Sequence, residues 1–178
     1  MSDTTFRSFI DSRDDAEVRS QLLVDLDALA PAPGRAPAAA DVFTRPSLLR
    51  RLARRLAVHV PAGTDRLLVP SLADAPLGAA LALATGLPFA IPGADGDAYG
   101  ETHGSERVAV LAFVQGDLPD LAERAADRRM VVAARLAVLP SEGPPDRAAP
   151  ASEAPSSGAG AGVPVVVLAD ELAREVTE

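Results

Sequence analysis

Apolar residues recur along much of the chain at the three- and four-residue spacing of an α-helix. The clearest case is residues 46–60, in which leucines and alanines form two adjoining rows and four arginines cover the opposite face. Pro46 stands where a helix tolerates proline best, in its first turn. The pattern therefore predicts an amphipathic helix over 46–60, and a similar apolar stripe predicts a helix over 14–30.

Farther along the chain the pattern changes to short, continuous apolar runs. Such runs are typical of strands that are buried on both faces of a parallel sheet. We assign strands to 65–70, 87–92, 108–114 and 130–139, helices to 75–86 and 118–127, and a last strand and short helix to 163–176. This alternation predicts one α/β domain over residues 1–178, with a parallel sheet and an N-terminal helical segment.

Residues 141–162 differ from the rest of the chain in composition. Pro, Gly, Ala and Ser make up 18 of these 22 residues. Because such a segment has few side chains to bury, we expect it to be disordered or a mobile loop. The apolar strand that follows it predicts an insertion within the domain rather than a tail.

Composition narrows the chemistry that is available to the chain. All 17 basic residues are arginine, so no lysine can form a Schiff base or a mobile phosphate clamp. The chain has no cysteine, which excludes disulfides, thiol catalysis and zinc sites built on cysteine. The formal net charge of −8 argues against nucleic acid as the main partner, because phosphate backbones attract clustered cations.

The sequence also bears on where the protein works. The first 15 residues carry acids and no apolar run, so no signal peptide is expected there. No stretch approaches the roughly 20 apolar residues that span a bilayer. We therefore expect a bacterial-type cytoplasmic protein that does not interact with membranes.

Three segments, taken in order, carry a resemblance to a known family. They are GRAPAAADVFTRPSLLRRLARRLA at 34–57, LLVPSLADAPLGAALALATGLPFAI at 67–91 and VPVVVLADELAREV at 163–176. In this order they resemble orotate phosphoribosyltransferase, of the type I phosphoribosyltransferase family. The resemblance implies that family's Rossmann-like α/β fold, transfer of a phosphoribosyl group from phosphoribosyl pyrophosphate, and dimerisation.

At the sites that carry the family's chemistry, however, the sequence departs from the family pattern. Where the resemblance implies lysine and histidine that neutralise pyrophosphate, the loop 93–105 has acids. The matching pyrophosphate loop, 71–75, contains Asp74, whose charge would repel that ligand. At the ribose-phosphate turn the family's acids and threonines are replaced by a shorter Gln115-Gly116-Asp117 turn, which we do not expect to cradle a phosphate.

We therefore predict neither a catalytic residue nor a metal site. His103 is interpreted as solvated surface because the sequence shows no evident partner to orient it as a general base. The acids of loop 93–105 are interpreted in the same way because they lack the regular spacing of a calcium loop. Asp117 is at least as plausible as the N-cap of helix 118–127 as it is a ligand contact. The candidate ligand-binding residues are Arg35, Ser71, Asp74, Gln115, Gly116 and Asp117.

The favoured hypothesis is a degenerate, non-catalytic phosphoribosyltransferase-like protein without a cofactor. It would act as a scaffold, regulatory or partner subunit, either as a homodimer or with a related protein. The alternative is an active phosphoribosyltransferase or a nucleotide or phosphate sensor in pyrimidine (orotate) metabolism. That alternative implies a small phosphorylated ligand, with magnesium if phosphoribosyl pyrophosphate binds. A third hypothesis makes residues 141–162 the recognition element of an interaction module.

Overall fold

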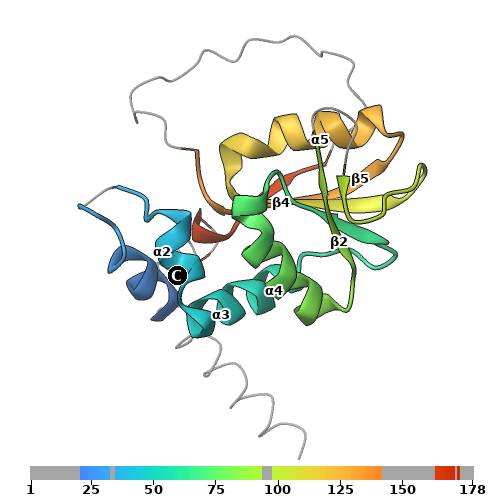
Figure 1. The fold of residues 1–178 in the computed structure, drawn as a ribbon. Coiled ribbons are helices and arrows are strands. Elements are labelled where there is room, and N and C mark those ends of the chain that lie inside the picture. Colours follow the sequence, from blue (N-terminus) through green and yellow to red (C-terminus); the bar gives the residue numbers. More distant parts are fainter. Residues whose placement is uncertain (1–20, 33–34, 94–97, 142–162, 171, 173–178) are drawn as a thin grey trace, which may run out of the picture.

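A six-stranded sheet forms the centre of the computed structural model, which describes residues 21–32, 35–93, 98–141, 163–170 and 172 (Figure 1). In spatial order the strands are β3 (Ala98–Tyr99), β2 (Phe89–Pro92), β1 (Arg66–Leu68), β4 (Arg107–Val114), β5 (Val131–Leu139) and β6 (Val165–Val167). The last five strands in this order are parallel, and β3 runs antiparallel to β2. The predicted α/β fold with a parallel sheet is confirmed.

Helices cover both faces of this sheet (Figure 1). One face carries the helical residues 21–27 together with α2 (Ala39–Phe43), α3 (Pro46–Ala57) and α4 (Ala75–Thr85), and the other carries α5 (Leu118–Asp127). Side chains of β4 alternate between the two resulting cores: Leu111 faces α3 and α4, whereas Val110 and Ala112 face α5. All three are fully buried, which explains why this strand is apolar throughout rather than alternating.

Helix α4 lies unusually close to the sheet, and a glycine permits this. A Cβ built on Gly78 would lie 2.9 Å from Val69 Cγ1 and 3.0 Å from Phe89 Cδ2. The helix ends at Gly86, whose left-handed conformation (φ 75°) allows its N–H to bond the Ala82 carbonyl. Gly78 therefore permits the close approach of α4 to Val69 and Phe89, and Gly86 ends the helix.

Replacing Gly78 with alanine is expected to lower the free energy of unfolding by about 1 kcal/mol. The added methyl group overpacks the contact with Val69, at about 1–3 kcal/mol, and the better helix propensity of alanine offsets roughly 1 kcal/mol of this. Gly104→Ala is a matched control, because its Cβ would meet only the Arg128 carbonyl oxygen at 3.7 Å. Urea denaturation of both variants tests the prediction, and equal stabilities would contradict it.

The observed elements differ from the predicted ones mainly at their ends. The helix predicted over 46–60 ends at Ala57, after which the His59 N–H bonds the Leu56 carbonyl in a tighter turn. The short α2 and β3 are missed by the sequence pattern, as are two 3₁₀ turns, η1 (Leu72–Asp74) and η2 (Gln115–Asp117). Residues 14–20 of the first predicted helix and residues 142–162 of the predicted insertion lie outside the described residues.

Candidate functional site

The carboxyl ends of β1 and β4 form the point where the fold places a ligand site. These neighbouring parallel strands lead, through η1 and η2, into helices on opposite faces of the sheet: α4 on one face and α5 on the other. Where two neighbouring parallel strands lead into helices on opposite faces, a crevice forms outside the strand ends, and this is the usual binding position in open α/β sheets. We call this position the β1–β4 crevice.

The side chain of Asp74 occupies the inner end of the β1–β4 crevice. Its Oδ1 accepts a hydrogen bond from the Phe113 N–H at 3.3 Å, and its Oδ2 accepts one from the Ser71 hydroxyl at 2.9 Å. Strand β1 pairs with β4 only as far as Leu68 opposite Val110, so the Phe113 N–H has no β1 partner. Asp74 satisfies this backbone donor from a residue that is only 8% exposed.

The electrostatic setting of Asp74 is unfavourable to its charge. Burial is the main effect and raises the pKa of this carboxyl above its ordinary value, and the nearby charge of Asp117 raises it further. The hydrogen bonds from Ser71 and Phe113 lower the pKa but do not reverse the shift. In the described part of the chain, the charged group that affects Asp74 is therefore a second carboxylate rather than a cation.

Asp117 lies at the N-cap position of α5 but makes no capping hydrogen bond through its side chain. It is the last residue of the 3₁₀ turn η2 and has helical backbone angles (φ −84°, ψ −12°), whereas a capping residue is normally extended. Asp117 therefore occupies the N-cap position that the sequence offered as one interpretation, but without the side-chain hydrogen bond of a capping residue. Its carboxylate instead lies near Asp74, where it adds negative charge to the crevice.

Arg124 is the cation that the sequence patterns missed in this region. From α5 its guanidinium donates to the carbonyls of Pro70 (3.3 Å) and Pro92 (2.7 Å), which follow β1 and end β2. It also forms an ion pair with Asp120 at 2.9 Å. These contacts tie α5 to the strand ends, so this guanidinium is engaged by the protein itself.

Two adjoining hollows lie beside the crevice, at the carboxyl ends of β4 and β5. The first, of about 620 Å³, has Asp41, Gly116 and Ser141 among its lining residues. The second, of about 860 Å³, is lined by Arg35 and again by Ser141. Their remaining walls are largely apolar and come from Pro31, from Ala36 and Pro37, and from the end of β5.

The structure thus divides the predicted site residues into two groups. Ser71, Asp74 and Asp117 meet at the β1–β4 crevice. Gly116 and Arg35 instead line the two hollows, and Gln115 begins the η2 turn between the groups. Ser141 was missed because it begins a low-complexity stretch, where no periodic pattern marks a site.

The sequence also predicted no metal site and no interaction with membranes. Among the described residues, no group of three or more histidines and acids is arranged to hold a metal ion. His103 is exposed, and its Nε2 lies 3.9 Å from Glu101. The acids at 95 and 97 lie outside the described residues. Within the described part of the chain, no helix combines the length and the apolar character needed to cross a membrane.

Solved structures with the same fold are phosphoribosyltransferases. The chain resembles UMP synthase from Leishmania donovani with a TM-score of 0.59 and 17% identity, over 91% of this chain and 38% of that one. Adenine phosphoribosyltransferase from Saccharomyces cerevisiae gives a TM-score of 0.56 and 14% identity, over 84% and 99%. Orotate phosphoribosyltransferase from Mycobacterium tuberculosis, solved with inorganic phosphate, gives a TM-score of 0.55 and 14% identity, over 69% of this chain and 76% of that one.

These comparisons confirm a type I phosphoribosyltransferase-like fold, and the fold is all that they show. Because the matches include adenine and orotate enzymes alike, the particular resemblance to orotate phosphoribosyltransferase stays a prediction. The chain also spans only 38% of the length of the UMP synthase. No protein-family model matches the sequence, and no curated protein sequence matches it.

Proposed function

We propose that this protein is a non-catalytic member of the phosphoribosyltransferase fold that acts as a scaffold, regulatory or partner subunit. The observation that carries the proposal is the position of Asp74, whose carboxylate takes the backbone N–H of Phe113 at the β1–β4 crevice. Loops at this point bind phosphates through backbone N–H groups that face the ligand. Here an internal anion already uses such a donor.

Charge supports the same conclusion. A pyrophosphate group entering the crevice would meet the buried Asp74 and the exposed Asp117, and both carboxylates would oppose an anion. Transfer of a phosphoribosyl group requires stabilisation of negative charge on the departing pyrophosphate. In this arrangement the described side chains would raise the barrier to that step.

The alternative function is that of a sensor for a small phosphorylated ligand, and one observation favours it. The hollows beside the crevice provide about 620 and 860 Å³, and their charged and hydroxyl lining residues are Asp27, Arg35, Asp41 and Ser141. Pockets of this size with a few polar groups are typical of small-molecule sites. A sensor would bind its ligand there and leave the Asp74 contact intact.

A thermal-shift titration separates these functions. Phosphoribosyl pyrophosphate with magnesium, orotate, adenine, inorganic phosphate and nucleoside monophosphates are each added at millimolar concentration. The non-catalytic proposal predicts an unchanged melting temperature with all of them, because only a ligand that binds the native state stabilises it. A rise with nucleotides or phosphate that Arg35→Ala abolishes would support the sensor, whereas a rise with phosphoribosyl pyrophosphate that Arg35→Ala leaves intact would contradict both.

A further inference from the structure

A long groove lies between helices α3 and α4 on the surface of the molecule. Its first part, of about 580 Å³, is lined along α3 from Pro46 to Ala57 and along α4 by Ala80, Leu83 and Ala84. A second hollow, of about 300 Å³, shares Ala57 and Ala84 with the first, so the two adjoin. We call them together the α3–α4 groove. Because α3 has 12 residues, the groove follows about 18 Å of helix, or about three turns.

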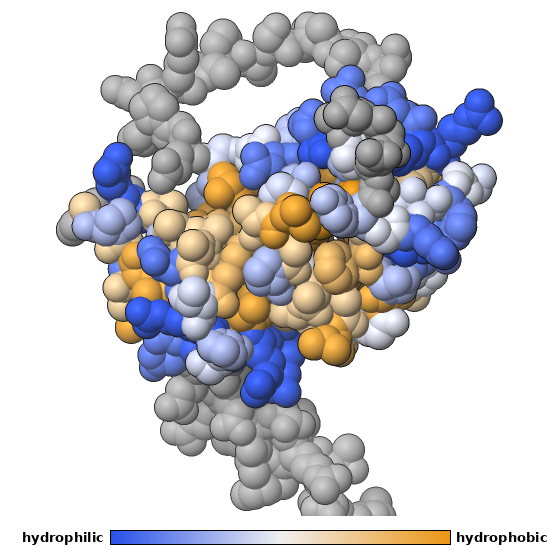
Figure 2. Space-filling view, viewed as in Figure 1, coloured by the Kyte–Doolittle hydropathy of each residue, from blue (hydrophilic) through white to orange (hydrophobic). Residues whose placement is uncertain are grey.

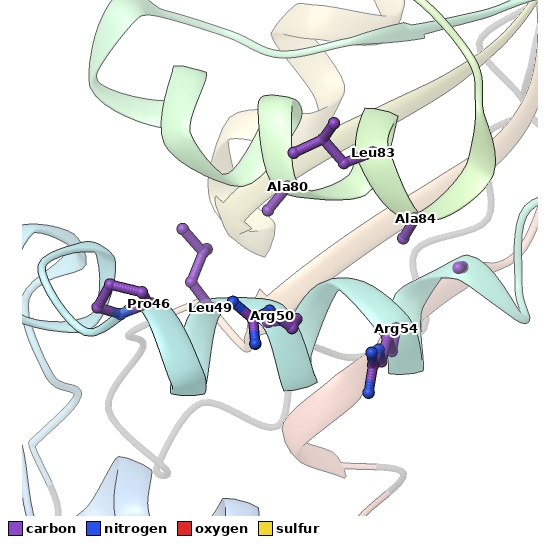
Figure 3. Close-up of a pocket in the computed structure, with 8 residues that line it drawn as sticks. Pro46, Leu49, Arg50, Arg54, Ala80, Leu83 and Ala84 are labelled. Carbon is purple, nitrogen blue, oxygen red and sulfur yellow. The ribbon is translucent and has the colours of Figure 1, made fainter.

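The walls of the α3–α4 groove are largely apolar. Figure 3 shows Leu49 of α3 and Ala80 of α4 pointing toward one another across it. Leu83 is 90% exposed, although α4 already buries Leu77 and Leu81 on its other side. Figure 2 shows apolar surface across the middle of this view, with hydrophilic surface below it. A helix that is apolar all round is normally covered, and exposed apolar surface of this kind marks an interaction site.

Two arginines make the α3 edge of the groove cationic. Arg50 and Arg54 are exposed and lie four residues apart, so their side chains follow one another along one face of α3. Within the described part of the chain, neither side chain forms a hydrogen bond or an ion pair, whereas Arg51 of the same helix pairs with Asp25. Among the described residues, no acid lines either part of the groove. In a chain with a net charge of −8, this edge therefore carries uncompensated positive charge beside an apolar wall.

We propose that the α3–α4 groove binds an amphipathic helix of a partner protein, with acidic residues one turn apart along one edge of its apolar stripe. A helix that binds in a groove uses apolar anchors that recur every three or four residues. These anchors would pack against Leu49 and Leu83, and the acids would pair with Arg50 and Arg54, which are also one turn apart. The inference rests on the proposed role as a scaffold, regulatory or partner subunit, and it gives that role a surface and a class of partner.

Shape and charge favour such a helix over two other occupants. A second copy of this chain would bring the same arginines to a contact centred on the groove, and like charges across an interface oppose binding. A lipid surface is flat, whereas Leu49 and Ala80 are only partly exposed and face each other within a hollow. An acidic amphipathic helix matches both the length of the groove and the charge of its edge.

Fluorescence anisotropy of a labelled synthetic peptide tests the proposal on the full chain. The probe is a helical peptide of about 16 residues, which is long enough to follow α3 throughout. It has leucines at the a and d positions of its heptads and two glutamates, one turn apart, along one edge of that stripe. A matched peptide has lysines in place of the two glutamates. We expect the glutamate peptide to bind with a dissociation constant below about 100 μM, and the lysine peptide at least about tenfold more weakly.

Charge reversal on α3 tests the role of the two arginines. Arg50→Glu with Arg54→Glu is expected to bind the lysine peptide at least about tenfold more tightly than the glutamate peptide. This gain of binding also shows that the variant folds, because an unfolded chain has no groove. Arg107→Glu with Arg129→Glu is the matched control, because both arginines are exposed, lie outside the groove and change the net charge equally. The control is expected to keep the preference of the wild type for the glutamate peptide.

A second variant tests the apolar contact. Leu83→Asp is expected to weaken binding of the glutamate peptide at least about tenfold, because it removes an apolar contact and adds a carboxylate beside the peptide's acids. Leu83 is almost fully exposed, so this variant is expected to fold, which circular dichroism checks. Val24→Asp is the control, since Val24 is 59% exposed on helical residues 21–27 and does not line the groove.

Three results would overturn the proposal: a wild type that does not bind the glutamate peptide at about 100 μM, equal binding of the two peptides, and binding that Leu83→Asp leaves unchanged. Co-sedimentation with phosphatidylglycerol vesicles that Arg50→Glu with Arg54→Glu abolishes, without peptide binding, would overturn it and assign the surface to lipid. These results concern the groove alone. A failure of the proposed function is distinguished from them by the thermal-shift titration, in which phosphoribosyl pyrophosphate would stabilise the protein.

Discussion

Replacing Asp74 with asparagine is expected to raise the free energy of unfolding at neutral pH, whereas replacing it with alanine is expected to lower it by about 1–3 kcal/mol. Asparagine keeps both contacts, since its oxygen accepts from the Phe113 N–H and its amide donates to the Ser71 hydroxyl, and it removes the buried charge. Alanine removes the charge as well but leaves a buried backbone donor without an acceptor. Comparing the two variants therefore separates the effect of the Asp74 hydrogen bonds on the free energy of unfolding from the effect of its charge.

The gain from Asp74→Asn is also expected to depend on pH. Burial raises the pKa of Asp74 above its ordinary value of 3.8, so the folded state resists ionisation of this group. The protonated Asp74 carboxyl makes a favourable contribution to the free energy of unfolding. This contribution is fully present below pH 3.8 and is lost as the pH rises through the folded-state pKa. The stability difference between the two proteins should therefore be largest at neutral pH and close on acidification.

Urea denaturation of the wild type and both variants between pH 3 and pH 7 measures these differences. The control is Asp120→Asn, which also removes one negative charge, from a side chain that is 72% exposed. If Asp74→Asn were as destabilising as Asp74→Ala, the carboxylate would be a favourable part of the site. The description of Asp74 as a buried, unfavourable anion would then be wrong.

Replacing Arg66 with methionine is expected to lower the free energy of unfolding by about 2–3 kcal/mol. Arg66 and Glu106 form a two-pronged ion pair, with Nε to Oε2 and Nη2 to Oε1 both at 3.0 Å. Their side chains are only 11% and 14% exposed, so the variant leaves a largely buried carboxylate without its partner. Glu106 also accepts from the His103 N–H at 3.1 Å, which anchors the loop before β4.

The stability lost in Arg66→Met is expected to depend on pH in the opposite sense to the stability gained in Asp74→Asn. The hydrogen bonds from Arg66 hold the pKa of Glu106 below its ordinary value of 4.5. The pair therefore stabilises the fold above pH 4.5, and this contribution is lost as the pH falls through the folded-state pKa. The difference in free energy of unfolding between the wild type and Arg66→Met should become smaller at acidic pH.

A double variant distinguishes the lost ion pair from lost packing. Arg66→Met with Glu106→Gln removes both charges, and replacing both members of a buried pair is often close to neutral. We expect it to recover much of the stability that Arg66→Met loses. Equal stabilities of the single and double variants, measured by thermal and urea denaturation at pH 7, would contradict an electrostatic origin.

The sequence was sufficient to predict the parallel sheet and its long helices because their signals are local. The apolar run 108–114 corresponds to β4 (Arg107–Val114), and helix 118–127 was predicted with its observed ends. Elements that depend on tertiary contacts were missed: β3 has two residues and exists through its pairing with β2, and α2 has only five. Periodicity needs longer segments than these.

The sequence pointed to Asp74 but not to its contacts. It placed Asp74 in the loop after β1, where the structure has it, and the repulsion of an anion by this residue stays a prediction. Its bond to the Phe113 N–H joins residues 39 positions apart and arises because β1 is shorter than β4, which no local pattern reports. Arg124 was missed for the same reason, since its acceptors are carbonyls on distant strand ends.

A ¹H–¹⁵N NMR titration with phosphoribosyl pyrophosphate and magnesium tests most directly whether Asp74 keeps this ligand out of the β1–β4 crevice. The resonances to follow are the backbone amides of Phe113, Asp74 and Gly116, because they line the crevice and its adjoining hollow. These signals are expected to stay unchanged at millimolar ligand. Saturable shifts of the Phe113 and Asp74 amides would mean that the carboxylate yields its place to pyrophosphate, and would contradict the non-catalytic function proposed for this protein.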